Sequence, residues 1–167
     1  MKKWQVAIAI VVAFALGGAG GFLAEHQHLK DKSNQSASTP TTVARGKGVR
    51  WFAAPKAACP SLKAITTSGV AAYTAIVKKM PWTTISPALL AQQKGTTTAL
   101  KALLPKATPQ GKAALNRLIL HSAQVTAAVP KATSQATFAV AAKALATPAV
   151  KRDTVILNRA IATCAKS

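Results

Sequence analysis

Few side chains capable of catalysis occur in the second half of this chain, and they form no familiar set. From residue 56 onward there is one histidine, His121, and one acidic residue, Asp153. A Ser/His/Asp nucleophile would have to combine these two with Ser122 or Ser134. Glycoside hydrolysis needs a pair of carboxylates, and no glycine-rich nucleotide motif is present. We therefore expect no catalytic residues, no cofactor and no small-molecule substrate.

The histidines do not predict a metal site either. His26 and His28 follow Glu25, but residues two apart point to different sides of a helix, and no further ligand lies nearby. His121 lies off the apolar positions of its segment, which predicts a place at the surface.

The two cysteines, Cys59 and Cys164, are the only ones in the chain. In an exported protein such a pair predicts one intramolecular disulfide, with an intermolecular bridge or two free thiols as the alternatives. Closing a loop of this size stabilises the fold by roughly 4 to 5 kcal/mol in the chain-entropy account.

Positive charge is the dominant feature of the composition. The chain carries 22 Lys and Arg against 3 Asp and Glu, a formal charge of +19, and residues 32 to 152 contain no carboxylate side chain. Lysine exceeds arginine, and lysine acts as a point charge, which favours binding by charge density without sequence reading. We predict a non-enzymatic domain that binds an anionic partner: an envelope polymer, a membrane surface or a nucleic acid. The candidate anion-binding residues are Arg45, Lys47, Arg50, Lys101, Lys106, Lys112, Arg117, Lys151 and Arg152.

An alternative interpretation needs no anionic ligand. The scarcity of carboxylates would be an adaptation to acid in a structural or stress-related envelope module that acts through protein–protein contacts.

Asp153 has Lys151 and Arg152 beside it, but no cation at the i+3 or i+4 spacing that pairs along a helix. This predicts almost no internal ion pair, and hence melting that is nearly flat between about pH 7 and pH 3.

The N-terminal segment, residues 1–24, predicts insertion into a membrane. Lys2 and Lys3 precede an uncharged stretch, Trp4 to Ala24, and about 20 apolar residues span a bilayer as a helix. The lysines hold the front of this segment in the cytoplasm, which places the following domain outside as a single-pass protein.

Two further interpretations of residues 1–24 stay open. A cleaved signal peptide would use the apolar stretch Val6 to Leu16 and release a secreted protein. The small residues Ala13, Gly17 and Gly21 recur every four positions, which allows two such helices to pack as a homodimer.

Residues 25–55 predict a polar linker. Ser, Thr, Asn, Gln, Gly and Pro dominate it, without a helical or strand period. Its end, "RGKGVRWF", places basic residues beside Trp51 and Phe52, a combination that suits an anionic membrane or a nucleic acid. We favour packing of the two aromatic side chains on the following domain, because a core with few aromatics gains much from burying them.

Residues 56–167 predict an all-α fold: a small up-down bundle of about four helices. Apolar residues recur at three- and four-residue steps, as in Leu62, Ile65, Gly69, Tyr73 and Ile76. Ser or Thr caps a helix and Pro suits its first position, so helices are expected to begin at Cys59-Pro60, Ser86-Pro87, Thr108-Pro109 and Thr147-Pro148, and near Ser134.

The predicted disulfide constrains the helix count. The first start and the last end of an up-down bundle meet only if the number of helices is even. We therefore read 134 to 165 as one helix that is kinked or broken at Pro148, or else as a short fourth piece lying across the bundle.

Overall fold

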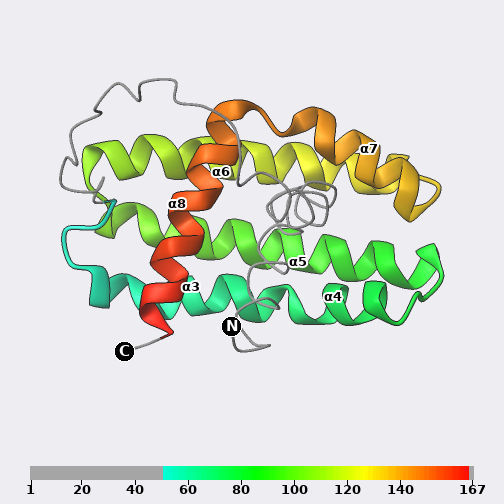
Figure 1. The fold of residues 1–167 in the computed structure, drawn as a ribbon, viewed down its shortest axis with the longest axis horizontal. Helices are drawn as coiled ribbons and strands as arrows, with labels where there is room; N and C mark the ends of the chain where they lie inside the picture. Colours follow the sequence, from blue (N-terminus) through cyan, green and yellow to red (C-terminus); the bar gives the residue numbers. More distant parts are fainter. Residues whose placement is uncertain (1–50, 166–167) are drawn as a thin grey trace, which may run out of the picture.

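The computed structural model describes residues 51–165, and these residues form an all-α domain (Figure 1). The predicted span Trp4 to Ala24, the small-residue row, the pair His26 and His28, and the basic residues Arg45, Lys47 and Arg50 lie outside the described residues. The α-helices are α3 (Pro55–Ser68), α4 (Val70–Val77), α5 (Trp82–Leu103), α6 (Pro109–Ala128), α7 (Gln135–Leu145) and α8 (Pro148–Cys164), with two short 3-10 helices, η1 (Leu104–Lys106) and η2 (Val129–Lys131).

Three long helical segments form the body of the bundle. Helices α3 and α4 run in line along one side, α5 returns beside them, and α6 runs along α5 (Figure 1). Helix α7 folds back along α6, and α8 then crosses the bundle to reach α3 (Figure 1). The expected all-α bundle is confirmed.

Three of the expected helix starts are confirmed by their caps. The side chains of Thr108 and Thr147 accept hydrogen bonds from the backbone N–H of Gly111 at 3.1 Å and Val150 at 3.3 Å. Ser134 begins α7 with a reciprocal capping box, in which its hydroxyl accepts from Thr137 N–H at 3.2 Å. These caps satisfy backbone donors that have no partner within the helix.

The other two expected starts are wrong, because Pro60 and Pro87 lie inside their helices. Helix α3 begins at Pro55 and α5 at Trp82, so each internal proline is the sixth residue of its helix. A proline in the second turn forfeits one backbone hydrogen bond, a cost that burial of the helix can offset. The Ser-Pro and Cys-Pro pairs resemble caps in sequence, but tertiary packing extends both helices by a turn.

The expected helix over 134 to 165 is broken, not kinked, before Pro148: α7 ends at Leu145, and α8 begins at Pro148 as a separate helix. Helix α7 has 11 residues and α6 has 20, so α8 starts part-way along the bundle and crosses it (Figure 1). This crossing brings Cys164 back to Cys59, and the disulfide is confirmed with a Cα–Cα distance of 5.4 Å. The even-number rule fails because α8 does not run along the bundle axis.

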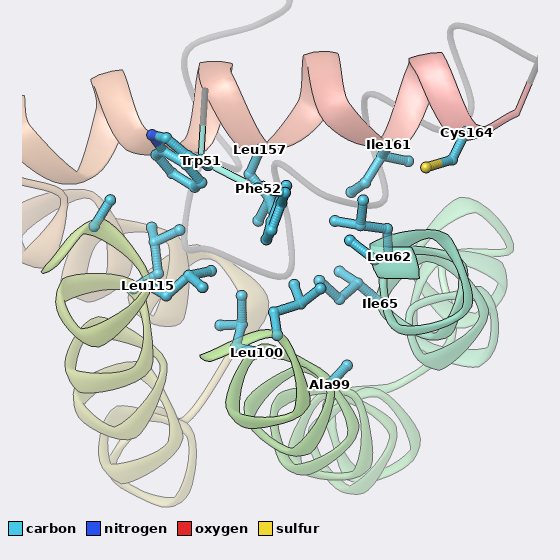
Figure 2. Packing of buried hydrophobic residues seen from close by; sticks show 14 of the residues in the cluster. Trp51, Phe52, Leu62, Ile65, Ala99, Leu100, Leu115, Leu157, Ile161 and Cys164 are labelled. Carbon is cyan, nitrogen blue, oxygen red and sulfur yellow. The ribbon is translucent and has the colours of Figure 1, made fainter. Parts of the chain in front are cut away.

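The interior contains two hydrophobic clusters. The first lies under α8, where Leu62, Leu100, Leu115 and Leu157 from four helices meet (Figure 2). The second lies at the other end of α5 and α6, where Ile85, Leu89, Val125 and Phe138 meet. The disulfide closes the first cluster, and Trp82 packs on Phe138 beside the second with ring centroids 5.8 Å apart.

Trp51 and Phe52 form part of the first cluster, which confirms the expected packing. Each is 4% exposed, and both lie between α8 and the helices beneath it (Figure 2). The carbonyl oxygen of Trp51 accepts from Thr108 N–H at 2.8 Å. These aromatic rings are therefore not available to stack on bases or to enter a membrane.

Candidate anion-binding surface

The described residues carry positive charge almost entirely at the surface. Fourteen Lys and Arg residues and one acidic residue, Asp153, lie between positions 51 and 165. Lys106 is half-buried, and the other thirteen cationic residues are exposed. In this part of the chain thirteen cations therefore have no carboxylate side chain to pair with, because Asp153 is bound by Arg117.

Arg117 and Asp153 form the single ion pair of the described residues, which agrees with the expectation of almost no internal ion pair. Arg117 Nε donates to Asp153 Oδ2 at 2.8 Å, joining α6 to α8. The Asp153 side chain is 3% exposed and that of Arg117 is 44% exposed. The hydrogen bond to Asp153 raises the pKa of Arg117 above its ordinary value, and burial opposes this rise only in part. The partners are 36 positions apart, so local spacing could not reveal the pair.

The predicted anion-binding residues fall into two groups on the structure. Lys101 in the last turn of α5, Lys106 in η1 and Lys112 in the first turns of α6 follow one another around a single connection. Lys151 and Arg152 lie in the first two turns of α8, directly before Asp153, which forms the ion pair with Arg117. Neither group has a carboxylate side-chain partner among the described residues; Lys106 is half-buried, and the other four residues are exposed.

A buried polar layer separates the two hydrophobic clusters. Ser122 on α6 donates to the side-chain oxygen of Gln93 on α5 at 2.8 Å, and Thr97 lies 2.9 Å from the same hydroxyl. Thr96 meets Ser68 at 3.3 Å on the α3 side. These residues lie midway along the helices, between the clusters.

The residues considered for nucleophilic chemistry are buried, cap a helix or bind other side chains of the domain. His121 is 1% exposed, so the expectation of a surface histidine is wrong; it lies in the polar layer beside Ser122. The reason is that the core-facing arc of α6 is wide enough to include both residues. Ser122 is held by Gln93, Ser134 caps α7, and Asp153 binds Arg117.

The described part of the chain contains neither a group of metal-binding side chains nor a membrane-spanning helix. No group of three or more His, Cys, Asp or Glu residues in positions 51–165 could hold a metal ion. Within the same positions, no helix combines the length and apolar character needed to cross a membrane.

Comparisons with protein-family models, with curated proteins and with solved structures find no match to this chain. Function therefore has to be argued from the residues and their geometry alone.

Proposed function

We propose that this chain is a non-enzymatic, membrane-tethered domain that lies outside the cytoplasm and binds an anionic partner through its lysine-rich surface. The observation that carries the proposal is the number of cations without an internal carboxylate: thirteen of the fourteen within residues 51–165, twelve of them exposed. A surface of one sign attracts partners of the other sign and repels copies of itself.

The compartment is supported by the disulfide. The bond between Cys59 and Cys164 is typical of oxidising, extracytoplasmic environments. Together with the apolar segment from Trp4 to Ala24, it supports a single-pass protein with its C-terminal domain outside the cell membrane. A secreted form after signal cleavage would present the same domain.

The centre of the proposed surface is the connection between α5 and α6. Lys101, Lys106 and Lys112 lie within twelve consecutive residues there, on two helix ends and the 3-10 helix that joins them. Lysines spaced so closely form a local maximum of positive potential for phosphate, sulfate or carboxylate groups.

Retention on heparin tests this function. The full chain in non-ionic detergent should bind immobilised heparin at low salt and elute as salt rises. Binding to duplex DNA should also weaken with salt, and each contact with a phosphate of B-DNA should add about −0.9 to the slope of log affinity against log salt. The triple variant Lys101→Gln/Lys106→Gln/Lys112→Gln should elute at lower salt than the matched triple Lys94→Gln/Lys131→Gln/Lys143→Gln. No retention at low salt, or binding that ignores salt, would reject the proposal and favour the acid-adapted module.

A further inference from the structure

One exposed face of the bundle combines lysines with unpartnered apolar side chains. Lys56, Lys63, Val70 and Val77 recur at intervals of seven along α3 and α4, and all four are exposed. A seven-residue step drifts only about 20° around a straight helix, so Lys56 and Lys63 lie in one row on α3 and Val70 and Val77 in one row on α4, which runs in line with α3 (Figure 1). The opposite face carries buried residues such as Leu62 and Ala72.

The apolar half of this row runs along α4 and ends at the turn between α4 and α5; this exposed face of α4 together with the turn, Val70 to Met80, is called the tip below. Val70 is 55% exposed, Val77 59% and Met80 40%, within eleven consecutive residues. The other large exposed apolar side chains of the described residues stand singly on separate helices: Leu120 on α6, Val140 on α7 and Val155 on α8. Single exposed apolar residues are ordinary, whereas a group at one tip calls for a partner.

Lys78 and Lys79 also belong to the tip, and Lys79 has an unusual backbone conformation. Lys79 has φ of 52°, in the left-handed region that favours glycine. It occupies the position after the C-cap of α4, where Lys79 N–H donates to Ile76 O at 2.9 Å and Met80 N–H to Ala75 O at 3.0 Å. This pair of bonds ends a helix most easily with glycine, yet the chain carries a lysine beside Lys78.

We propose that the tip formed by Val70, Val77, Lys78, Lys79 and Met80, with Lys63 seven residues before Val70 on α3, docks on an anionic lipid bilayer. Apolar side chains enter the acyl boundary while lysines reach headgroup phosphates, the usual arrangement of a helix bound at a membrane surface. A second copy of the chain is disfavoured because it would bring lysines against lysines. A soluble polyanion could pair with the lysines but offers no apolar region in which the valine side chains could be buried.

The predicted tether is long enough for this contact. Residues 25–50 belong to the linker expected from sequence, and a flexible chain of that length would have an end-to-end distance of about 28 Å. Helix α5, with 22 residues, measures about 33 Å, so the tether and the bundle have similar lengths. The docking rests on the proposed function, an anionic partner outside the cytoplasm, and adds a lipid contact at the end of α5 opposite to Lys101, Lys106 and Lys112.

Methyl NMR of the full chain in lipid nanodiscs tests the orientation directly. Discs contain phosphatidylcholine alone or with phosphatidylglycerol, and a trace of lipid carries a paramagnetic headgroup. In the anionic discs the methyl signals of Val70, Val77 and Met80 should lose intensity, while those of Val140 and Val155 keep theirs. Equal loss at all of these residues, or no loss at Val70 and Val77 in anionic discs, overturns the docking.

Variants separate lipid docking from general charge attraction. Lys63→Gln/Lys78→Gln/Lys79→Gln should restore the Val70 and Val77 signals in anionic discs, whereas Lys94→Gln/Lys131→Gln/Lys143→Gln, which removes the same charge, should not. Lys79→Gly suits the left-handed backbone, so it should preserve or raise the melting temperature and still weaken the intensity loss at Val77. If Lys79→Gly leaves that loss unchanged, Lys79 has no part in lipid contact and the proposed tip is wrong.

Failure of the docking is distinguishable from failure of the proposed function. Heparin retention of the full chain reports binding of any polyanion, and the nanodisc spectra report lipid contact at this tip alone. Heparin retention without the expected intensity loss refutes docking and leaves a soluble polyanion as the partner. Absence of both refutes the proposed function as well.

Discussion

Arg117 on α6 and Asp153 on α8 form an ion pair at 2.8 Å, across 36 positions of sequence. Asp153 is the only acidic residue between positions 51 and 165, and its side chain is buried on the side of α8 that faces the bundle. The pair therefore fixes the position of α8 together with the disulfide at the other end of that helix.

Removing Arg117 should destabilise the domain more than removing both partners. Arg117→Gln leaves a buried carboxylate without its cation, whereas Arg117→Met/Asp153→Leu replaces the pair by apolar side chains. We expect the melting temperature of the full chain in detergent to fall most for Arg117→Gln and less for the double variant. Arg159→Gln, on the exposed face of α8, is the control and should change little. A double variant as unstable as Arg117→Gln would contradict this account.

The raised pKa of Arg117 gives the pair a defined pH dependence. Because the folded-state pKa lies above arginine's ordinary value, the stabilisation is fully present below that ordinary value and is lost only as pH rises through the folded-state pKa. Lysine has an ordinary pKa of about 10.4, so the stability deficit of Arg117→Lys relative to wild type should grow between about pH 10 and pH 12. Arg159→Lys should show no such growth. Urea unfolding across this pH range measures both.

The disulfide should contribute strongly to stability, because it closes a long loop. Cys59 and Cys164 are separated by 105 positions, and the chain-entropy account gives about 4 to 5 kcal/mol for such a loop. Cys59→Ser/Cys164→Ser should lower the free energy of unfolding of the full chain by a few kcal/mol, as measured by urea titration. Reductant should produce the same change in wild type and none in the double variant; equal stability of all these forms would contradict the prediction.

Gly111 is required where α6 passes the end of the linker. A Cβ at this position would meet the carbonyl oxygen of Trp51, which is backbone and cannot rotate away. Gly111→Ala should therefore destabilise by about 1 to 3 kcal/mol from overpacking, despite alanine's better helix propensity. Gln110→Ala, one residue earlier and exposed, should stay within about 0.5 kcal/mol. Trp51 fluorescence and urea unfolding test the pair; a stabilised Gly111→Ala would show that Trp51 does not pack there.

Local sequence chemistry predicted much of this fold, and non-local geometry accounts for the rest. The caps at Thr108, Ser134 and Thr147 were readable because a cap depends on a few neighbouring residues. The positions of Pro60 and Pro87 inside helices depend on packing, which propensity does not report.

The candidate site was predicted in its charge but not in its arrangement. The excess of lysine was plain from composition, whereas the partner of Asp153 depends on the crossing of α8, which no periodicity encodes. The row through Val70 and Val77 did leave a signal: both residues lie outside the apolar positions of their segment.

Salt should stabilise this domain near neutral pH, because repulsion dominates its surface. Residues 56–167 carry fifteen cations and one Asp or Glu side chain, and within the described part that carboxylate is already paired to Arg117. Like charges lower the stability of a compact state, and 0.1 M salt screens them over about 10 Å. The melting temperature of the full chain should therefore rise with sodium chloride, and rise less in Lys94→Gln/Lys131→Gln/Lys143→Gln, which has three fewer charges to screen.

The salt dependence should be steeper when the one carboxylate side chain of the described residues is removed. Asp153→Asn adds one unit of net positive charge and leaves Arg117 without its carboxylate, so its melting temperature should lie below that of wild type at low salt and rise more with sodium chloride. Melting scans of the two full-length proteins across a salt series measure this difference. The melting profile expected from sequence, nearly flat between about pH 7 and pH 3, stays a prediction, and the same scans at several pH values test it. A melting temperature that falls with salt would show that attraction dominates this surface.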